Sequence, residues 1–312
     1  MDCLVGYLVG YLVGYLVVCL VSYLVGYLVG YLGAQRKNTL KATWLVILVP
    51  MIKTLLASKA NRLFLILSGI FISNALIAEF IGGKIFSLER TLGFSPVSFD
   101  LLGESGLSFQ LTAGVLLWPV VFIMTDIINE YYGVRGVRFL SYLTVGLIVL
   151  AFGSVYGASQ LVPADWWVGV NAEKGVPDMQ KAFAALFGQG LWIIIGSITA
   201  FLIGQLLDVA VFHRIKRWTG EGKIWLRATG STLVSQWVDS FVVIFIAFYI
   251  GQGWSFPKVL AIALVGYTYK FVVALLATPL IYGVHALIER YLGVALATEM
   301  KKAALADAVD NR

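Results

Sequence analysis

Long apolar runs, separated by short polar connections, dominate this chain from Met51 onward. Each run approaches or exceeds the roughly 20 residues that a helix needs to cross a bilayer. The six spans predicted in this way cover residues 62–82, 109–132, 137–161, 182–211, 228–250 and 258–287. The pattern predicts an all-α polytopic membrane protein, a bundle of six transmembrane helices within residues 51–290, followed by a polar cytoplasmic tail over residues 291–312.

Residues 1–50 form a separate, low-complexity apolar segment. The tetrapeptide Leu-Val-Gly-Tyr recurs from Leu4 to Tyr15 and again from Leu24 to Tyr31. The segment is long enough to be an additional membrane span. It is also compatible with translation of a short DNA repeat upstream of a true start at Met51. We favour the second interpretation, because glycine at every fourth position lowers helix propensity by about 1 kcal/mol each and the features of a signal peptide are lacking.

Composition supports the membrane assignment and excludes several classes of protein. The chain is 60% hydrophobic and only 13% charged, whereas about 25% of residues are charged in an average soluble domain. Its net charge of +6 does not indicate nucleic acid, because the basic residues lie in the connections between apolar runs. Both cysteines, Cys3 and Cys19, lie in the repeat, and the two histidines lie near predicted helix ends. We therefore expect neither a metal nor a cofactor.

The distribution of Lys and Arg predicts how the bundle is oriented. Basic residues cluster in three connections, at residues 53–62, 135–138 and 214–227. These connections alternate with neutral or weakly acidic ones. Because positively charged loops stay in the cytoplasm, both ends of the six-helix core are expected on the cytoplasmic side.

Polar residues interrupt several of the apolar runs. The candidate substrate-binding residues are Asp126, Asn129, Glu130, Gln205, Asp208, Ser235, Gln236, Asp239 and Lys270. A charged side chain at the bilayer centre costs about 2.5–3.5 kcal/mol on insertion scales, so such groups normally face a protein interior or an aqueous cavity. Gln205 and Asp208 are three residues apart, as are Gln236 and Asp239, and each pair lies on one helix face. Asn129 and Glu130 follow Asp126 by three and four residues, which places these three on one face as well. We expect a polar cavity that leads to the cytoplasm, although Ser and Gln side chains also serve simply to join helices.

Two of these residues are predicted to lie near the midplane of the bilayer. Asp239 is twelve residues from Arg227 and Lys270 is twelve residues from Lys258, or about 18 Å along each helix. The two side chains could therefore form an ion pair. Lys270 could equally take part in proton coupling, and the sequence does not separate these roles.

The segments that contain these residues resemble the queuosine precursor transporters, the VUT family. The resemblance is carried by residues 125–133, 204–208 and 231–240, with Lys270 after Tyr267 in the last span, and it extends over residues 63–290. It implies a secondary transporter in the bacterial inner membrane that imports 7-deazaguanine bases, the precursors of a modified tRNA nucleoside. The implied partners are a purine-like small molecule and the lipid bilayer, without nucleic acid.

The chemistry of the polar residues is compatible with such a substrate. A deazaguanine presents two adjacent N–H donors beside a carbonyl acceptor, so that a carboxylate and an amide match its edge. Two other classes of protein remain open. A substrate-binding subunit of an energy-coupling-factor importer would co-purify with ATPase subunits. An intramembrane aspartyl protease would use paired aspartates, but its Gly-x-Gly-Asp motif does not occur in the sequence, and we do not expect an enzyme.

Overall fold

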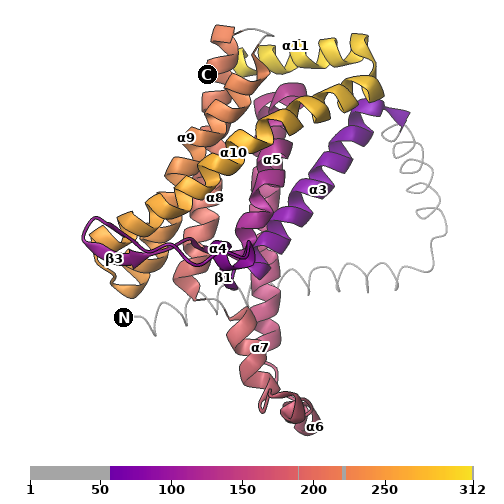
Figure 1. Cartoon of the computed structure of the whole chain (residues 1–312). Coiled ribbons are helices and arrows are strands. Elements are labelled where there is room, and N and C mark those ends of the chain that lie inside the picture. The colour runs from indigo at the N-terminus through magenta and orange to yellow at the C-terminus, as the bar shows by residue number, and fades with distance from the viewer. Residues whose placement is uncertain (1–56, 189, 220–222, 311–312) are drawn as a thin grey trace, which may run out of the picture. The chain divides into compact units, whose positions relative to one another are not determined.

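A computed structural model describes residues 57–188, 190–219 and 223–310, and most of these residues are helical (Figure 1). Five helical stretches in this part of the chain are long and apolar enough to cross a membrane. They are Lys59–Ile81 (α3), Trp118–Ser159 (α5), Met179–Thr219, Ile224–Ile250 and Phe256–Leu292 (α10). The all-α polytopic class is thereby confirmed, but the count of six helices is not. The two interpretations of residues 1–50 concern a segment outside the described residues.

The described chain divides into two compact units. The larger unit comprises residues 64–148 and 185–310 and contains every predicted site residue. The smaller unit includes residues 149–184. In it, Asp178 accepts a hydrogen bond from the Lys181 backbone N–H at 3.0 Å, and the Gln180 side chain donates to the Ser159 carbonyl at 3.0 Å. The first contact is local to the start of α7 (Met179–Phe187), and the second joins that start to the end of α5.

A single break explains why two predicted spans appear as one long element. Helix α5 has 42 residues, which would extend about 63 Å as a straight helix, twice the roughly 30 Å of a bilayer core. At Gly133 the backbone leaves the helical region, with φ of 69° and ψ of −168°. Essentially only glycine adopts this conformation. Gly133 therefore separates residues 118–132 from residues 134–159, which correspond to the second and third predicted spans.

The predicted start of the second span at residue 109 is wrong. Gln110–Thr112 forms strand β4, which pairs antiparallel with β1 (Ile85–Ser87), and Ala113–Leu116 forms the 3-10 helix η1. Strand pairing satisfies the backbone of residues 110–112 without a helix. Helix α5 begins only at Trp118, with Pro119 in its first turn, where proline is tolerated because its missing N–H has no helical partner.

The remaining elements of the connection between α3 and α5 are short. They are α4 (Leu88–Thr91), β2 (Phe99–Leu101) and β3 (Glu104–Leu107), the last two forming a hairpin. Glu89 holds the two ends of the connection together, because its carboxylate accepts hydrogen bonds from the Phe109 N–H at 2.9 Å and from the Ser87 hydroxyl at 2.9 Å. The Phe109 hydrogen bond is the main reason why the pKa of Glu89 is lowered.

The larger unit ends in four helices, three of which carry predicted site residues. They are α8 (Leu191–Thr219), α9 (Ile224–Ile244) with the π-helical extension η3 (Phe245–Ile250), α10, and α11 (Val294–Asp310). The fourth predicted span, residues 182–211, is divided between α7 and α8, where Gly188 and Gly190 weaken the helix. The predicted polar tail forms α11.

Small residues allow α8 and α9 to approach each other closely. A Cβ atom at Gly196 would lie 3.0 Å from the Val243 carbonyl oxygen, and one at Gly204 would lie 3.6 Å from the Asp239 Cβ. Such contacts are typical of helix packing in membranes, where close van der Waals contact replaces the hydrophobic effect. The close approach of α8 and α9 also limits the distance between the polar residues of α8 and those of α9.

Replacing Gly133 by alanine should destabilise the protein by about 1–3 kcal/mol, because a Cβ atom makes the observed backbone conformation strained. The control is Gly146→Ala in the same helix, since Gly146 has ordinary helical geometry and nothing within 4 Å of an added Cβ. Thermal unfolding in detergent would measure both variants. Equal melting temperatures for the two variants would contradict the assigned role of Gly133.

Acid should loosen the connection that Glu89 holds. A carboxyl group whose pKa is lowered by folding stabilises the fold above its unfolded pKa, and this contribution is lost as the pH falls through the folded pKa. Amide exchange at Phe109, corrected for its intrinsic pH dependence, should therefore accelerate severalfold between pH 6 and pH 3. In Glu89→Gln the exchange should be faster at pH 6 and independent of pH over this range.

Candidate functional site

Four of the predicted site residues are buried with side-chain atoms that have no hydrogen-bond partner in the described part of the chain. These atoms are Asp126 Oδ1, Asn129 Oδ1 and Nδ2, Asp208 Oδ2 and Gln236 Oε1. The exposed fraction of each of these residues is 4% or less. A buried polar atom without a partner costs about 1–3 kcal/mol, and such atoms are rare in native proteins. These atoms of the predicted site therefore have hydrogen-bonding capacity that no described residue uses.

Three helices contribute these side chains, and neighbouring residues orient them. On α8, Asp208 Oδ1 accepts a hydrogen bond from the Ser235 hydroxyl of α9 at 3.3 Å. Gln205 Oε1 accepts one from the Thr125 hydroxyl of α5 at 3.1 Å. The carboxylate of Asp126 lies close enough to that of Asp208 for the two to repel each other. Predicted residues from α5, α8 and α9 therefore meet at one place in the larger unit.

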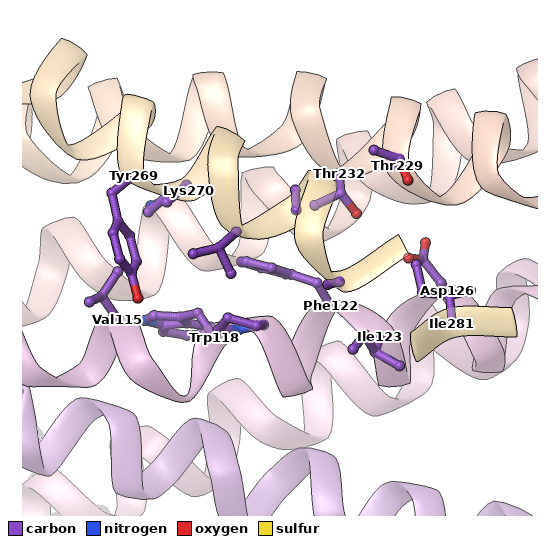
Figure 2. Close-up of a pocket in the computed structure, with 14 residues that line it drawn as sticks. Val115, Trp118, Phe122, Ile123, Asp126, Thr229, Thr232, Tyr269, Lys270 and Ile281 are labelled. Atoms are coloured by element: carbon purple, nitrogen blue, oxygen red, sulfur yellow. The ribbon is translucent and has the colours of Figure 1, made fainter. Parts of the chain in front are cut away.

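Asp126 also lines a narrow pocket (Figure 2). Asp126 lies near one end of the pocket, and Tyr269 and Lys270 lie at the other. Trp118 and Phe122 lie between these two ends, with their rings nearly parallel at 16° and their centroids 6.1 Å apart. The volume of the pocket is about 20 Å³, enough for about one water molecule. The helices must move apart before the pocket can admit a larger molecule.

Tyr269 was not among the predicted site residues, and Trp118 and Phe122 were missed as well. Both lie in a part of the chain that was predicted as ordinary apolar helix, and an aromatic residue there is more often in contact with lipid or with the core. Their spacing of four residues, together with Asp126 four residues further on, places all three on one helix face. That spacing was the available signal.

Glu130 is held differently from the other predicted carboxylates. Its carboxylate forms ion pairs with Lys216 Nζ at 3.2 Å and with Arg227 at 2.8 Å, and Arg227 Nε donates a further hydrogen bond at 3.0 Å. All three side chains are completely buried. Glu130 is thus paired with cations of α8 and α9. It therefore differs from Asp126 and Asp208, which each keep an unpartnered oxygen.

Lys216 and Arg227 were assigned in the sequence to a basic connection that sets orientation. The structure places Lys216 in the last turn of α8 and Arg227 in the first turn of α9, inside the bundle. The physical reason is that a buried carboxylate requires a partner of opposite charge. The signal in the sequence was that Lys216 follows the fourth predicted span and Arg227 directly precedes the fifth.

The predicted ion pair between Asp239 and Lys270 is confirmed, with Lys270 Nζ 2.5 Å from Asp239 Oδ2. The two side chains are 19% and 14% exposed. Glu79 of α3, which is outside the predicted site, lies near enough to repel Asp239, and it binds the Ser197 hydroxyl at 2.6 Å. This second charged cluster is linked to the pocket through Lys270.

Comparison with known proteins places the chain among membrane transporters. Residues 112–284, which include every predicted site residue, match the family described as "Putative vitamin uptake transporter". The chain is 31% identical over 204 residues to the "Probable queuosine precursor transporter" of Bacillus subtilis (strain 168), covering 63% of this chain and 82% of the relative. It is 30% identical over 192 residues to the "Queuosine precursor transporter" of Escherichia coli (strain K12), covering 59% and 76%. No solved structure matches the chain.

The Asp239–Lys270 pair gives a prediction about coupled changes. Asp239→Asn or Lys270→Gln alone leaves one buried charge without its partner, which should cost about 3 kcal/mol of stability. The double variant removes both charges and should therefore be more stable than either single variant. Protein yield and melting temperature in detergent would measure this. Effects that simply add would show that the two residues do not interact.

Proposed function

The chain belongs to the queuosine precursor transporter family, and we propose that it imports queuosine precursors, the 7-deazaguanine bases, across the bacterial inner membrane. The observation that carries this proposal is the group of buried, unpartnered carboxylate and amide atoms on α5, α8 and α9 beside an aromatic pocket. The names of the relatives indicate transport and not catalysis.

The free atoms match the hydrogen-bonding edge of such a base. A deazaguanine offers a ring N–H and an exocyclic amine side by side, which one carboxylate can accept, and a carbonyl that needs a donor. Asp126 and Asp208 each supply an unpartnered carboxylate oxygen, and Asn129 supplies an unpartnered amide N–H. Binding would therefore satisfy atoms that are otherwise buried at a cost, which favours the ligand-bound state.

The walls of the pocket match the flat face of the base. Trp118 and Phe122 present nearly parallel rings to the same space, and Tyr269 approaches from α10. Stacking between aromatic rings adds about 0.5–1.5 kcal/mol beyond the apolar area that it buries. The site thus combines a polar edge with aromatic faces, as recognition of a planar heterocycle requires.

Electrostatics adds a preference among such bases. Among the described residues, the two charged clusters of the membrane helices contain five acidic side chains, at positions 79, 126, 130, 208 and 239, and three cations, at positions 216, 227 and 270. A protonated aminomethyl substituent on the base would find acidic side chains there that accept its hydrogen bonds. We also infer a multi-pass protein in which both ends of the helical core face the cytoplasm. The reason is that these ends lie on the same side as the basic connections, and positively charged connections stay in the cytoplasm.

Asp126→Asn and Asp208→Asn should each reduce uptake about ten- to hundredfold. The change converts an acceptor into a donor at nearly constant volume, and charge-assisted hydrogen bonds contribute about 1.5–3 kcal/mol. Uptake of a labelled 7-deazaguanine base in cells unable to synthesise it would measure the effect. The amount of protein in the membrane should remain normal.

The matched control is Asp165→Asn, because Asp165 is an exposed aspartate of the short helix α6 (Asp165–Val168). This variant should transport normally. Normal uptake by both Asp126→Asn and Asp208→Asn would exclude the proposed site.

A further inference from the structure

A second set of charged residues lies on the same helices as the unpartnered side chains. It is displaced from them toward one end of the bundle. On α5, Glu130 follows Asp126 by four residues, and on α8, Lys216 follows Asp208 by eight. At 1.5 Å per residue these separations are about 6 Å and 12 Å along the helices. Both displacements lead toward helix ends, at the break in α5 and at Thr219.

The other two helices repeat the arrangement. On α9, which runs away from this end, Arg227 precedes Ser235 by eight residues. On α10, His285 follows the pocket residue Ile281 by four residues toward the end of that helix. Each of the four helices therefore places a charged or titratable residue between the pocket and the same end of the bundle.

All four of these residues are buried. Glu130, Lys216 and Arg227 are 0% exposed, and His285 is 4% exposed. His285 Nδ1 lies 3.2 Å from the Tyr131 hydroxyl, which extends the layer along α5. The ion pairs join α5 to both α8 and α9, so a solute cannot pass from the pocket to this end unless the pairs separate.

Helix α11 contacts α10 and α5 next to these buried residues. Gly293, with φ of 87°, ends α10 and turns the chain into α11, which Figure 1 shows at the end where α10 finishes. Lys301 Nζ lies 2.5 Å from Glu289 Oε1 of α10 and 5.4 Å from the centre of the Tyr131 ring of α5. One side chain of α11 therefore contacts both α10 and α5 next to the buried layer.

We propose that Glu130, Lys216, Arg227, Tyr131 and His285 form the cytoplasmic gate of the transporter and that Lys301 is the latch that holds this gate closed. The proposal rests on the proposed function and on the expected orientation. Buried ion pairs suit a gate because they have two states, paired and dry or separated and hydrated, with little between them.

The gate is connected to the substrate site through Arg227. This guanidinium pairs with Glu130 and also attracts the carboxylate of Asp126. A substrate that donates hydrogen bonds to Asp126 takes part of this attraction away, so that occupancy of the site changes the forces on the gate. Binding and opening thus act on the same side chain, as coupling between two sites requires.

The latch can be tested without disturbing the buried ion pairs, whose removal would leave a buried charge without a partner. A single reporter, Ala277→Cys, is introduced at a residue that lines the pocket, in the full chain with Cys3→Ser and Cys19→Ser. Labelling by a membrane-impermeant maleimide is then measured in inside-out vesicles. Lys301→Met should accelerate labelling about two- to fivefold, the effect expected for loss of a partly exposed ion pair.

Two controls show whether the effect belongs to the latch. Lys302→Met changes an exposed lysine of the same helix and should label at the original rate. Lys301→Arg should restore slow labelling, because arginine keeps the charge and the contact with Glu289. Equal rates for Lys301→Met and its parent, or acceleration only in right-side-out vesicles, would overturn the proposal. Labelling is measured without substrate, so it is independent of whether the protein transports a deazaguanine.

Discussion

The cost of burying polar groups in a bilayer governs this protein. Water is absent from the hydrocarbon core, so that each charged or amide side chain there needs a protein partner or a ligand. The structure meets this requirement in two ways. Glu130, Lys216 and Arg227 satisfy one another, as do Asp239 and Lys270, whereas Asp126, Asn129, Asp208 and Gln236 retain unpartnered atoms. The first kind of group joins helices of the bundle, and the second keeps hydrogen-bonding capacity that no described residue uses.

The two kinds of group lie in successive layers, and this order gives a physical outline of transport. The unpartnered atoms, which we propose as the ligand site, lie between a narrow aromatic pocket and a layer of buried ion pairs. In this conformation the pocket holds little more than a water molecule and the layer of ion pairs is completely buried. A pocket of this volume is too small for a base. Movement of the helices must widen the pocket to admit a base and then separate the ion pairs to release it.

The sequence was most informative where a single physical rule decides the outcome. Apolar length predicted the membrane helices, and the depth of Asp239 and Lys270 predicted their ion pair, because a midplane charge has few alternatives. The start of α5 and the burial of Lys216 and Arg227 were missed, because each depends on a tertiary partner. The strand β1 removes residues 110–112 from the helix, and Glu130 draws the two cations into the bundle. Spacing along one chain does not reveal such partners.

The central claim is that the unpartnered atoms of Asp126, Asn129, Asp208 and Gln236 bind the substrate. An experimental structure of the protein with a bound 7-deazaguanine base tests it most directly. The account predicts that the N–H edge of the base lies within hydrogen-bond distance of Asp126 or Asp208. The ring of the base should lie against Trp118 or Phe122. A base bound elsewhere, with both aspartates still unpartnered, would contradict the account.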